Sequence, residues 1–214
     1  MAAGAVDVIG FLTLGGLFTS HITGNVVIVA AHYVTGGFSQ IGPLLAVPVF
    51  MVVMGLVTLA SSAIIRVGSY PVRPLLLLET ALLAGFLVLG VAFGRFADAD
   101  SSIAIVAGML GVSAMATQNV LGRLALKGAP STAVMTTNIT QLTVDLVTLA
   151  SRRRGNADEL ATARRRARMT LPCIVGFIGG CAAGAALEVK FGFWALALPV
   201  VLSALAVPLG EAEE

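Results

Sequence analysis

The stretch LGGLFTSHITGN, Leu14–Asn25, interrupts an apolar region that runs from Ala2 to Val34. A straight membrane helix needs about 20 apolar residues, so this region is too long for one span, and the interruption brings in glycines and polar side chains. A related cluster, MTTNITQLTV, begins at Met135, inside a second oversized region that covers residues 123–150. Both regions predict a broken or re-entrant helix whose extra length adds no net crossing of the membrane.

The composition assigns the chain to the integral membrane proteins. Of its 214 residues, 57% are hydrophobic and 11% are charged, whereas soluble domains average about 45–50% apolar and about 25% charged residues. Most of the chain must therefore lie in lipid, which leaves no room for a soluble catalytic domain. We expect one membrane domain over residues 1–214, with the lipid bilayer as a partner and no enzyme activity.

Five further stretches are apolar and long enough, or nearly long enough, to cross about 30 Å of hydrocarbon. They are residues 41–65, 74–94, 102–122, 171–187 and 191–209. Together with the first broken region they predict an all-α bundle of about six transmembrane helices.

Basic residues predict the orientation of this bundle. Arg66 and Arg73 flank one short connection, and seven arginines fall in residues 151–169, which we expect to form a basic loop. Loops rich in Lys and Arg stay in the cytoplasm, so both connections and both termini are predicted there. The arginines of this loop are expected to contact anionic lipid headgroups rather than nucleic acid: Arg152, Arg153, Arg154, Arg164, Arg165, Arg166 and Arg168.

The two halves of the sequence look duplicated. A shift of 113 residues places four residues of the first break on identical residues of the second: Gly15 on Gly128, Thr19 on Thr132, Thr23 on Thr136 and Asn25 on Asn138. Each half contributes three spans, an odd number, so the second copy enters the membrane in the opposite orientation. The pattern predicts inverted repeats, over residues 1–97 and 101–214, with matching broken helices as in secondary transporters.

The doubled polar cluster has two interpretations. Its candidate site residues are Thr23, Gly24, Asn25, Thr136, Thr137 and Asn138. Hydroxyl and amide groups satisfy backbone groups that a helix break leaves open, so the cluster can simply stitch the breaks together. Alternatively, the two breaks face each other near the midplane and bind an ion or a small polar solute.

Asp7 is a carboxylate inside an apolar helix, which costs about 2.5–3.5 kcal/mol on insertion scales and normally requires a partner. Arg123 and Lys127 are the candidate counter-charges. Two alternatives are a protonated Asp7 that serves proton coupling and an Asp7 that lies near the cytoplasmic surface. The surface position of Asp7 applies only if the native chain starts at Met1. We expect that the given sequence starts late, because the second repeat has an apolar run without a counterpart before Met1.

Other polar residues offer weaker signals. Gln118 and Asn119 lie late in the 102–122 span and either line the same cavity or bond neighbouring helices. Glu79 is expected to be interfacial, snorkelling or paired. His21 is a lone histidine beside a break, so we expect no metal site, and the sequence predicts neither a cofactor nor a catalytic residue.

Two long segments resemble a known family. GAVDVIGFLTLGGLFTSHITGNVVIV, from Gly4, and ATQNVLGRLALKGAPSTAVMTTNIT, from Ala116, are similar to the YoaK family, grouped as domain of unknown function 1275. The resemblance covers the whole chain and implies a six-span protein of the bacterial inner membrane, often regarded as a permease without an established substrate.

The combined expectation is a small-solute permease, or secondary transporter, whose site lies between the two Thr/Asn motifs. A structural or partner-binding membrane protein is the alternative, because stitching explains the same polar residues. The sequence does not specify the solute, the coupling ion, the direction of transport or the oligomeric state.

Overall fold

The computed structural model describes residues 1–35, 40–66, 72–94, 98–125, 135–151 and 156–211. Within these residues every regular element is a helix and no strand occurs, which confirms the predicted all-α class. Helices are the expected solution for such apolar sequence, because a helix satisfies its own backbone hydrogen bonds where lipid offers none.

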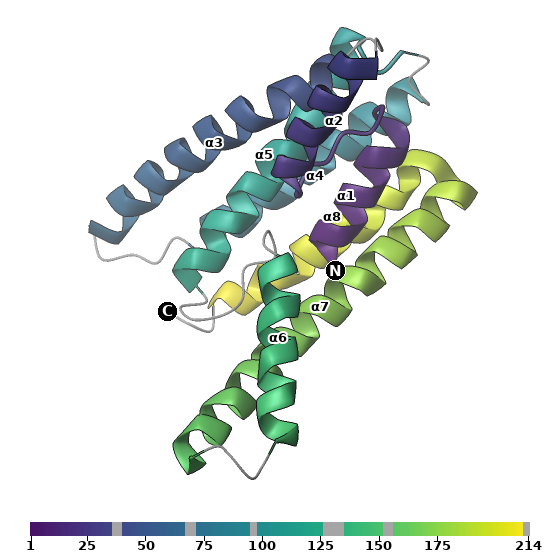
Figure 1. Ribbon diagram of the computed structural model, residues 1–214. Helices are drawn as coiled ribbons and strands as arrows, with labels where there is room; N and C mark the ends of the chain where they lie inside the picture. The colour runs from purple at the N-terminus through teal and green to yellow at the C-terminus, as the bar shows by residue number, and fades with distance from the viewer. Residues whose placement is uncertain (36–39, 67–71, 95–97, 126–134, 152–155, 212–214) are drawn as a thin grey trace.

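The long helices lie side by side in one bundle (Figure 1). In chain order the elements are α1 (Ala2–Thr13), α2 (Ile22–Thr35), α3 (Ile41–Arg66), α4 (Val72–Phe93), α5 (Ser102–Ala125), α6 (Met135–Ala150), α7 (Ala157–Phe191), the 3-10 helix η1 (Gly192–Leu196), α8 (Ala197–Ala206) and the 3-10 helix η2 (Pro208–Glu211).

Four helical segments of the described chain are long and apolar enough to cross a membrane. They cover residues 41–65, 72–93, 102–124 and 157–206. The first three coincide with predicted spans. The fourth combines α7, η1 and α8, and it includes the predicted span 171–187 and most of the predicted span 191–209. The chain turns between them at Gly192, which has a φ of 56°.

The first oversized region is broken, as predicted. Helix α1 ends at Thr13 and α2 begins at Ile22, and the intervening coil includes Gly15 and Gly16 with φ angles of 62° and 82°. These left-handed angles are strained for residues with a Cβ, so the glycine pair permits the reversal that brings the coil back along α1. In the second region α5 and α6 are also separate helices, and residues 126–134, between them, lie outside the described chain.

One prediction about the basic segment is wrong. Residues 157–169 were expected to belong to a loop, but they form the first turns of α7. The alanine- and arginine-rich sequence favours a helix, and Asn156 begins it: the Asn156 backbone N–H donates to a Glu159 carboxylate oxygen at 3.3 Å. An Asn followed three residues later by Glu is a helix-start signal that would have corrected the prediction.

Packing relates the elements in pairs. Helix α1 packs on α7 and α3 packs on α5, while the two short helices α2 and α6 pack on the helices that follow them, α3 and α7. Helix α4 packs on both α5 and α8. Helices α2 and α6 begin at Ile22 and Met135, which are 135 − 22 = 113 residues apart.

The contact between α1 and α7 depends on small residues. A Cβ on Gly180 would collide with the main-chain carbonyl of Met1, and a Cβ on Gly184 would lie 2.9 Å from the Cα of Ala5. Such close backbone approach replaces the hydrophobic driving force that lipid removes. It fixes α1, and with it Asp7, against the second half of α7.

Candidate functional site

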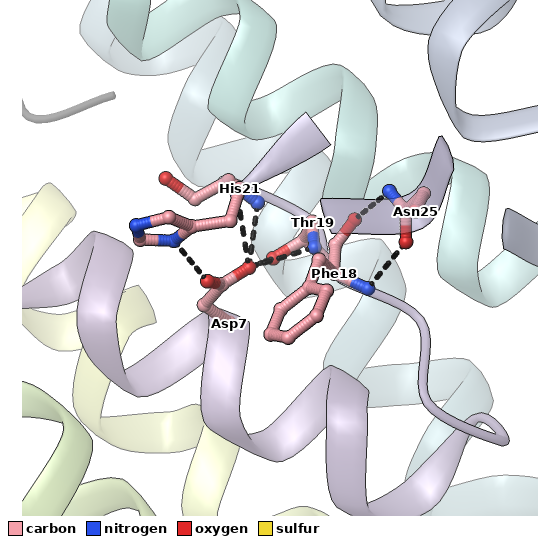
Figure 2. A network of polar contacts seen from close by, with 6 residues as sticks. Asp7, Phe18, Thr19, His21 and Asn25 are labelled. Atoms are coloured by element: carbon pink, nitrogen blue, oxygen red, sulfur yellow. Dashed lines mark hydrogen bonds and ion pairs between the residues drawn. The ribbon is translucent and has the colours of Figure 1, made fainter. Parts of the chain in front are cut away.

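Asp7 lies on α1 and is buried, with a relative exposure of 4%. Its Oδ1 accepts hydrogen bonds from the backbone N–H groups of Thr19 and Ser20 at 2.8 and 2.7 Å and, more weakly, of His21 at 3.4 Å. The Thr19 hydroxyl donates to the same oxygen at 3.3 Å. Three successive N–H groups just before α2 thus converge on one carboxylate (Figure 2), an arrangement that favours an anion because the N-terminus of a helix carries partial positive charge.

His21 is the side-chain partner of Asp7. Its Nδ1 lies 2.6 Å from Asp7 Oδ2, and its side chain is 34% exposed although that of Asp7 is only 5% exposed. The ring makes edge contacts with Phe177 of α7 and Phe18, at centroid distances of 5.2 and 6.2 Å. Figure 2 shows the second ring nitrogen directed away from Asp7.

Asn25 holds the break at Phe18. Its Oδ1 accepts from the backbone N–H of Phe18 at 2.9 Å and its Nδ2 donates to the Phe18 carbonyl at 2.7 Å. Asn25 is fully buried. Gly24, next to it, allows the Phe18 ring to approach, because a Cβ there would lie 2.8 Å from the ring. The contacts of Asn25 are therefore those that the stitching interpretation describes. Thr23 lies exposed on the first turn of α2.

The pair of Asp7 and His21 places an imidazole against a buried carboxylate. Imidazole is the side chain that titrates near neutral pH, and a carboxylate beside one ring nitrogen stabilises the charged form and fixes the orientation of the ring. The backbone donors keep the Asp7 carboxylate satisfied even when the imidazole is neutral. This site can therefore change its charge without losing the contacts that close the break.

Arg123 is not the partner of Asp7. A Cβ on Gly111 of α5 would lie 3.1 Å from Thr19, so Gly111 marks the level of the Asp7 site on that helix. Arg123 is 123 − 111 = 12 residues further along, about 18 Å at 1.5 Å per residue. The other candidate, Lys127, lies outside the described residues.

The structure does not bring the two polar clusters together. Asn138 is buried on α6, where Thr136 and Thr137 are exposed, but α6 packs on α7 whereas α2 packs on α3. Figure 1 shows α2 and α6 in different parts of the bundle, with the ends of other helices between them. The predicted face-to-face site is thus not observed, because each short helix covers the helix that follows it. Residues Gly128 and Thr132 lie outside the described chain.

Gln118 and Asn119 bond their neighbours rather than Asp7. Gln118 Nε2 donates to Glu79 Oε1 on α4 at 3.0 Å, and Asn119 Nδ2 donates to the Met115 carbonyl of its own helix at 2.9 Å. Glu79 is 2% exposed, so it is paired and buried rather than snorkelling.

A second buried acid, Asp145, joins α6 to α7. Arg166 donates to Asp145 Oδ1 through NH2 at 2.7 Å, and Gln141 Nε2 donates to the same oxygen at 3.0 Å. Asp145 is fully buried, whereas the Arg166 side chain is 51% exposed. Arg166 was expected to contact lipid headgroups, but the structure assigns it to this pair. Among the described residues no three His, Cys, Asp or Glu side chains gather in a way that could hold a metal ion.

Apolar helices of this length, with buried acids held by partners, are compatible with an integral membrane protein of the helical class. The family model described as "Protein of unknown function (DUF1275)" matches residues 1–209. The chain belongs to this family, as its two polar segments predict. Comparisons with curated proteins and with solved structures find no match.

Proposed function

We propose that this protein is a permease for a small polar solute and that the solute meets the protein at the first break, beside the Asp7–His21 pair. The observation that carries the proposal is a buried carboxylate held at the start of α2 together with a histidine that is one-third exposed. Ionisable residues inside a membrane bundle mark substrate or proton pathways more often than packing sites, because burying them is costly.

The helix pairing supports a repeat, which we propose to be inverted. Under the shift of 113 residues α2 corresponds to α6 and α3 to the first part of α7. The packing of α2 on α3 then corresponds to the packing of α6 on α7. Inverted repeats with broken helices in matching positions are typical of secondary transporters.

The proposed setting is the bacterial inner membrane, with both termini in the cytoplasm. Arg164, Arg165 and Arg168 are exposed on the first turns of α7. Basic residues beside a span favour the cytoplasmic side, and in this position they would contact anionic headgroups. Arg152, Arg153 and Arg154, which share this expectation, lie outside the described residues.

A structural or partner-binding role is the second candidate, and the contacts of Asn25 favour it. Both polar atoms of the Asn25 side chain are used on Phe18, so this residue offers nothing further to a solute. The two roles can be separated because stitching requires Asn25, whereas binding requires the exposed edge of His21. Neither role involves catalysis.

Unfolding in the presence of solutes tests the proposal. The purified protein is heated in detergent against a panel of ions, amino acids, sugars and nucleosides, alongside the variants His21→Gln and Arg166→Lys. A ligand that binds only the folded state stabilises it by about 2.7 kcal/mol at a hundred times its dissociation constant. We expect one solute class to stabilise the wild type and Arg166→Lys but not His21→Gln.

Two results would count against the permease. One is a panel that leaves the wild type unchanged throughout. The other is a solute that stabilises the wild type and His21→Gln equally, which would remove the first break as its binding site.

A further inference from the structure

Glu79 is an acid inside a membrane-spanning helix. It is the eighth residue of α4, whose 22 residues form a candidate span with a mean hydropathy of 2.3, and it is 2% exposed. Its hydrogen bond comes from the neutral amide of Gln118 on α5, 3.0 Å from Oε1. The position is therefore both apolar and closed to water.

Within the part of the chain that the structure describes, the elements around Glu79 bring no cation to it. On α5 the basic residue is Arg123, five residues beyond Gln118, and α4 itself carries Arg73 nearly two turns earlier. The segments η1 and α8 contain no titratable residue. The acid of η2 is Glu211, and η2 meets α4 at its first turn, where Gly210 approaches Val72.

The other two buried acids described above differ in this respect. Asp7 lies 2.6 Å from a histidine nitrogen and Asp145 lies 2.7 Å from an arginine nitrogen, whereas no ion pair of Glu79 occurs among the described residues. An ionised carboxylate buried without a counter-charge is penalised by several kcal/mol, and such a group takes up a proton instead.

We infer that Glu79 is a proton-binding site between α4 and α5, with Gln118 as its positioning residue. The neutral acid needs no counter-charge, and Gln118 keeps Oε1 satisfied by its amide N–H. This inference concerns Glu79 alone and holds whether or not the protein transports a solute at the first break.

Reaction with dicyclohexylcarbodiimide tests the inference. This apolar reagent adds the O–H of a protonated carboxyl across its C=N bond, and the adduct rearranges to a stable N-acylurea. The wild-type protein in liposomes is treated at about pH 6 and about pH 9, a range in which an ordinary Glu stays ionised. Adducts are assigned by peptide mapping of the wild type, so the result does not depend on the folding of a variant.

We expect the adduct on Glu79 at the lower pH and its loss at the higher pH. Asp145→Asn should leave the yield unchanged, and Glu79→Gln should abolish it. Gln118→Leu removes a donor that favours the ionised form, so labelling should persist to higher pH, and Gln118→Asn should partly restore the wild-type profile. If folded wild type shows no adduct on Glu79 at the lower pH while protein unfolded in urea does, the inference is overturned.

Discussion

The two buried aspartates of this bundle differ in how they are neutralised. Asp7 and Asp145 are both buried, and each meets a partly exposed basic side chain, at 2.6 and 2.7 Å. Asp7 is bound by three successive backbone N–H groups and a histidine. Asp145 is bound by an arginine and a glutamine.

The difference separates a site that can change its charge from one that cannot. Arginine stays protonated at any accessible pH, so Asp145–Arg166 is a permanent ion pair that fastens α6 to α7. Histidine gains and loses a proton near neutral pH, and the backbone donors hold Asp7 in either state. The Asp145–Arg166 pair is therefore structural in kind, whereas Asp7 and His21 lie where we propose that a solute binds.

The largest expected effect comes from Asp7→Ala. Removal of the carboxylate leaves the N–H groups of Thr19 and Ser20 buried without an acceptor, and it removes the partner of His21. We expect a loss of about 4 kcal/mol in unfolding free energy, since each buried donor left without an acceptor costs about 1–3 kcal/mol. SDS titration in mixed micelles, followed by circular dichroism, measures it. Asp7→Asn keeps an acceptor oxygen and should lose less; equal losses would show that the backbone donors contribute little.

Arg166→Ala should cost about 3 kcal/mol, because it leaves Asp145 buried and charged with one neutral donor. The same titration applies. Replacement of both members, Asp145→Leu with Arg166→Leu, should recover most of this loss, since apolar residues of similar volume often equal a buried ion pair in stability. A double variant as unstable as Arg166→Ala would contradict a purely structural pair.

Asn25→Ala should cost about 2 kcal/mol, because the N–H and carbonyl of Phe18 lose their partners in a buried position. Asn25→Asp provides a matched control. It keeps the acceptor for the Phe18 N–H but loses the donor and adds a charge, so it should be no more stable than Asn25→Ala. A stable Asn25→Asp would mean that the carbonyl of Phe18 finds another donor.

His21→Gln should have the smallest effect on stability, about 1 kcal/mol, because the backbone donors continue to hold Asp7. This substitution sharpens the comparison most, since it separates stability from solute binding. Its unfolding free energy should remain close to that of the wild type while stabilisation by solutes is lost. A loss as large as that of Asp7→Ala would make His21 a structural residue like Arg166.

The helical class and the break in the first region follow from the sequence because they depend on local properties. Apolar length determines which segments can span, and the Gly15–Gly16 pair allows the reversal of the chain. The prediction of a loop before Thr170 was wrong, because it followed the positive charge of the segment and not its helix propensity. Asn156 and Glu159 form a helix-start signal there.

The partners of the buried acids depend on tertiary contacts, which local sequence does not contain. Asp7 meets His21 only because the coil between them folds back along α1. Asp145 meets Arg166, 21 residues later, through the α6–α7 hairpin. The partner of Glu79 lies on another helix, 39 residues away. Arg123 was a reasonable candidate by charge, but its place on α5 excludes it.

Whether solutes reach His21 tests the proposal that a solute binds at the first break. His21→Cys, in a background in which Cys173 and Cys181 are replaced by serine, is treated in sealed vesicles with a membrane-impermeant maleimide. Tyr33→Cys, at an exposed position of α2, and Ser20→Cys, at a buried position, are the controls. We expect labelling of Cys at position 21 from one side of the membrane, slowed by the solute that stabilises the wild type. If Cys at position 21 is as unreactive as Cys at position 20 while Cys at position 33 reacts, the first break is not open to solutes.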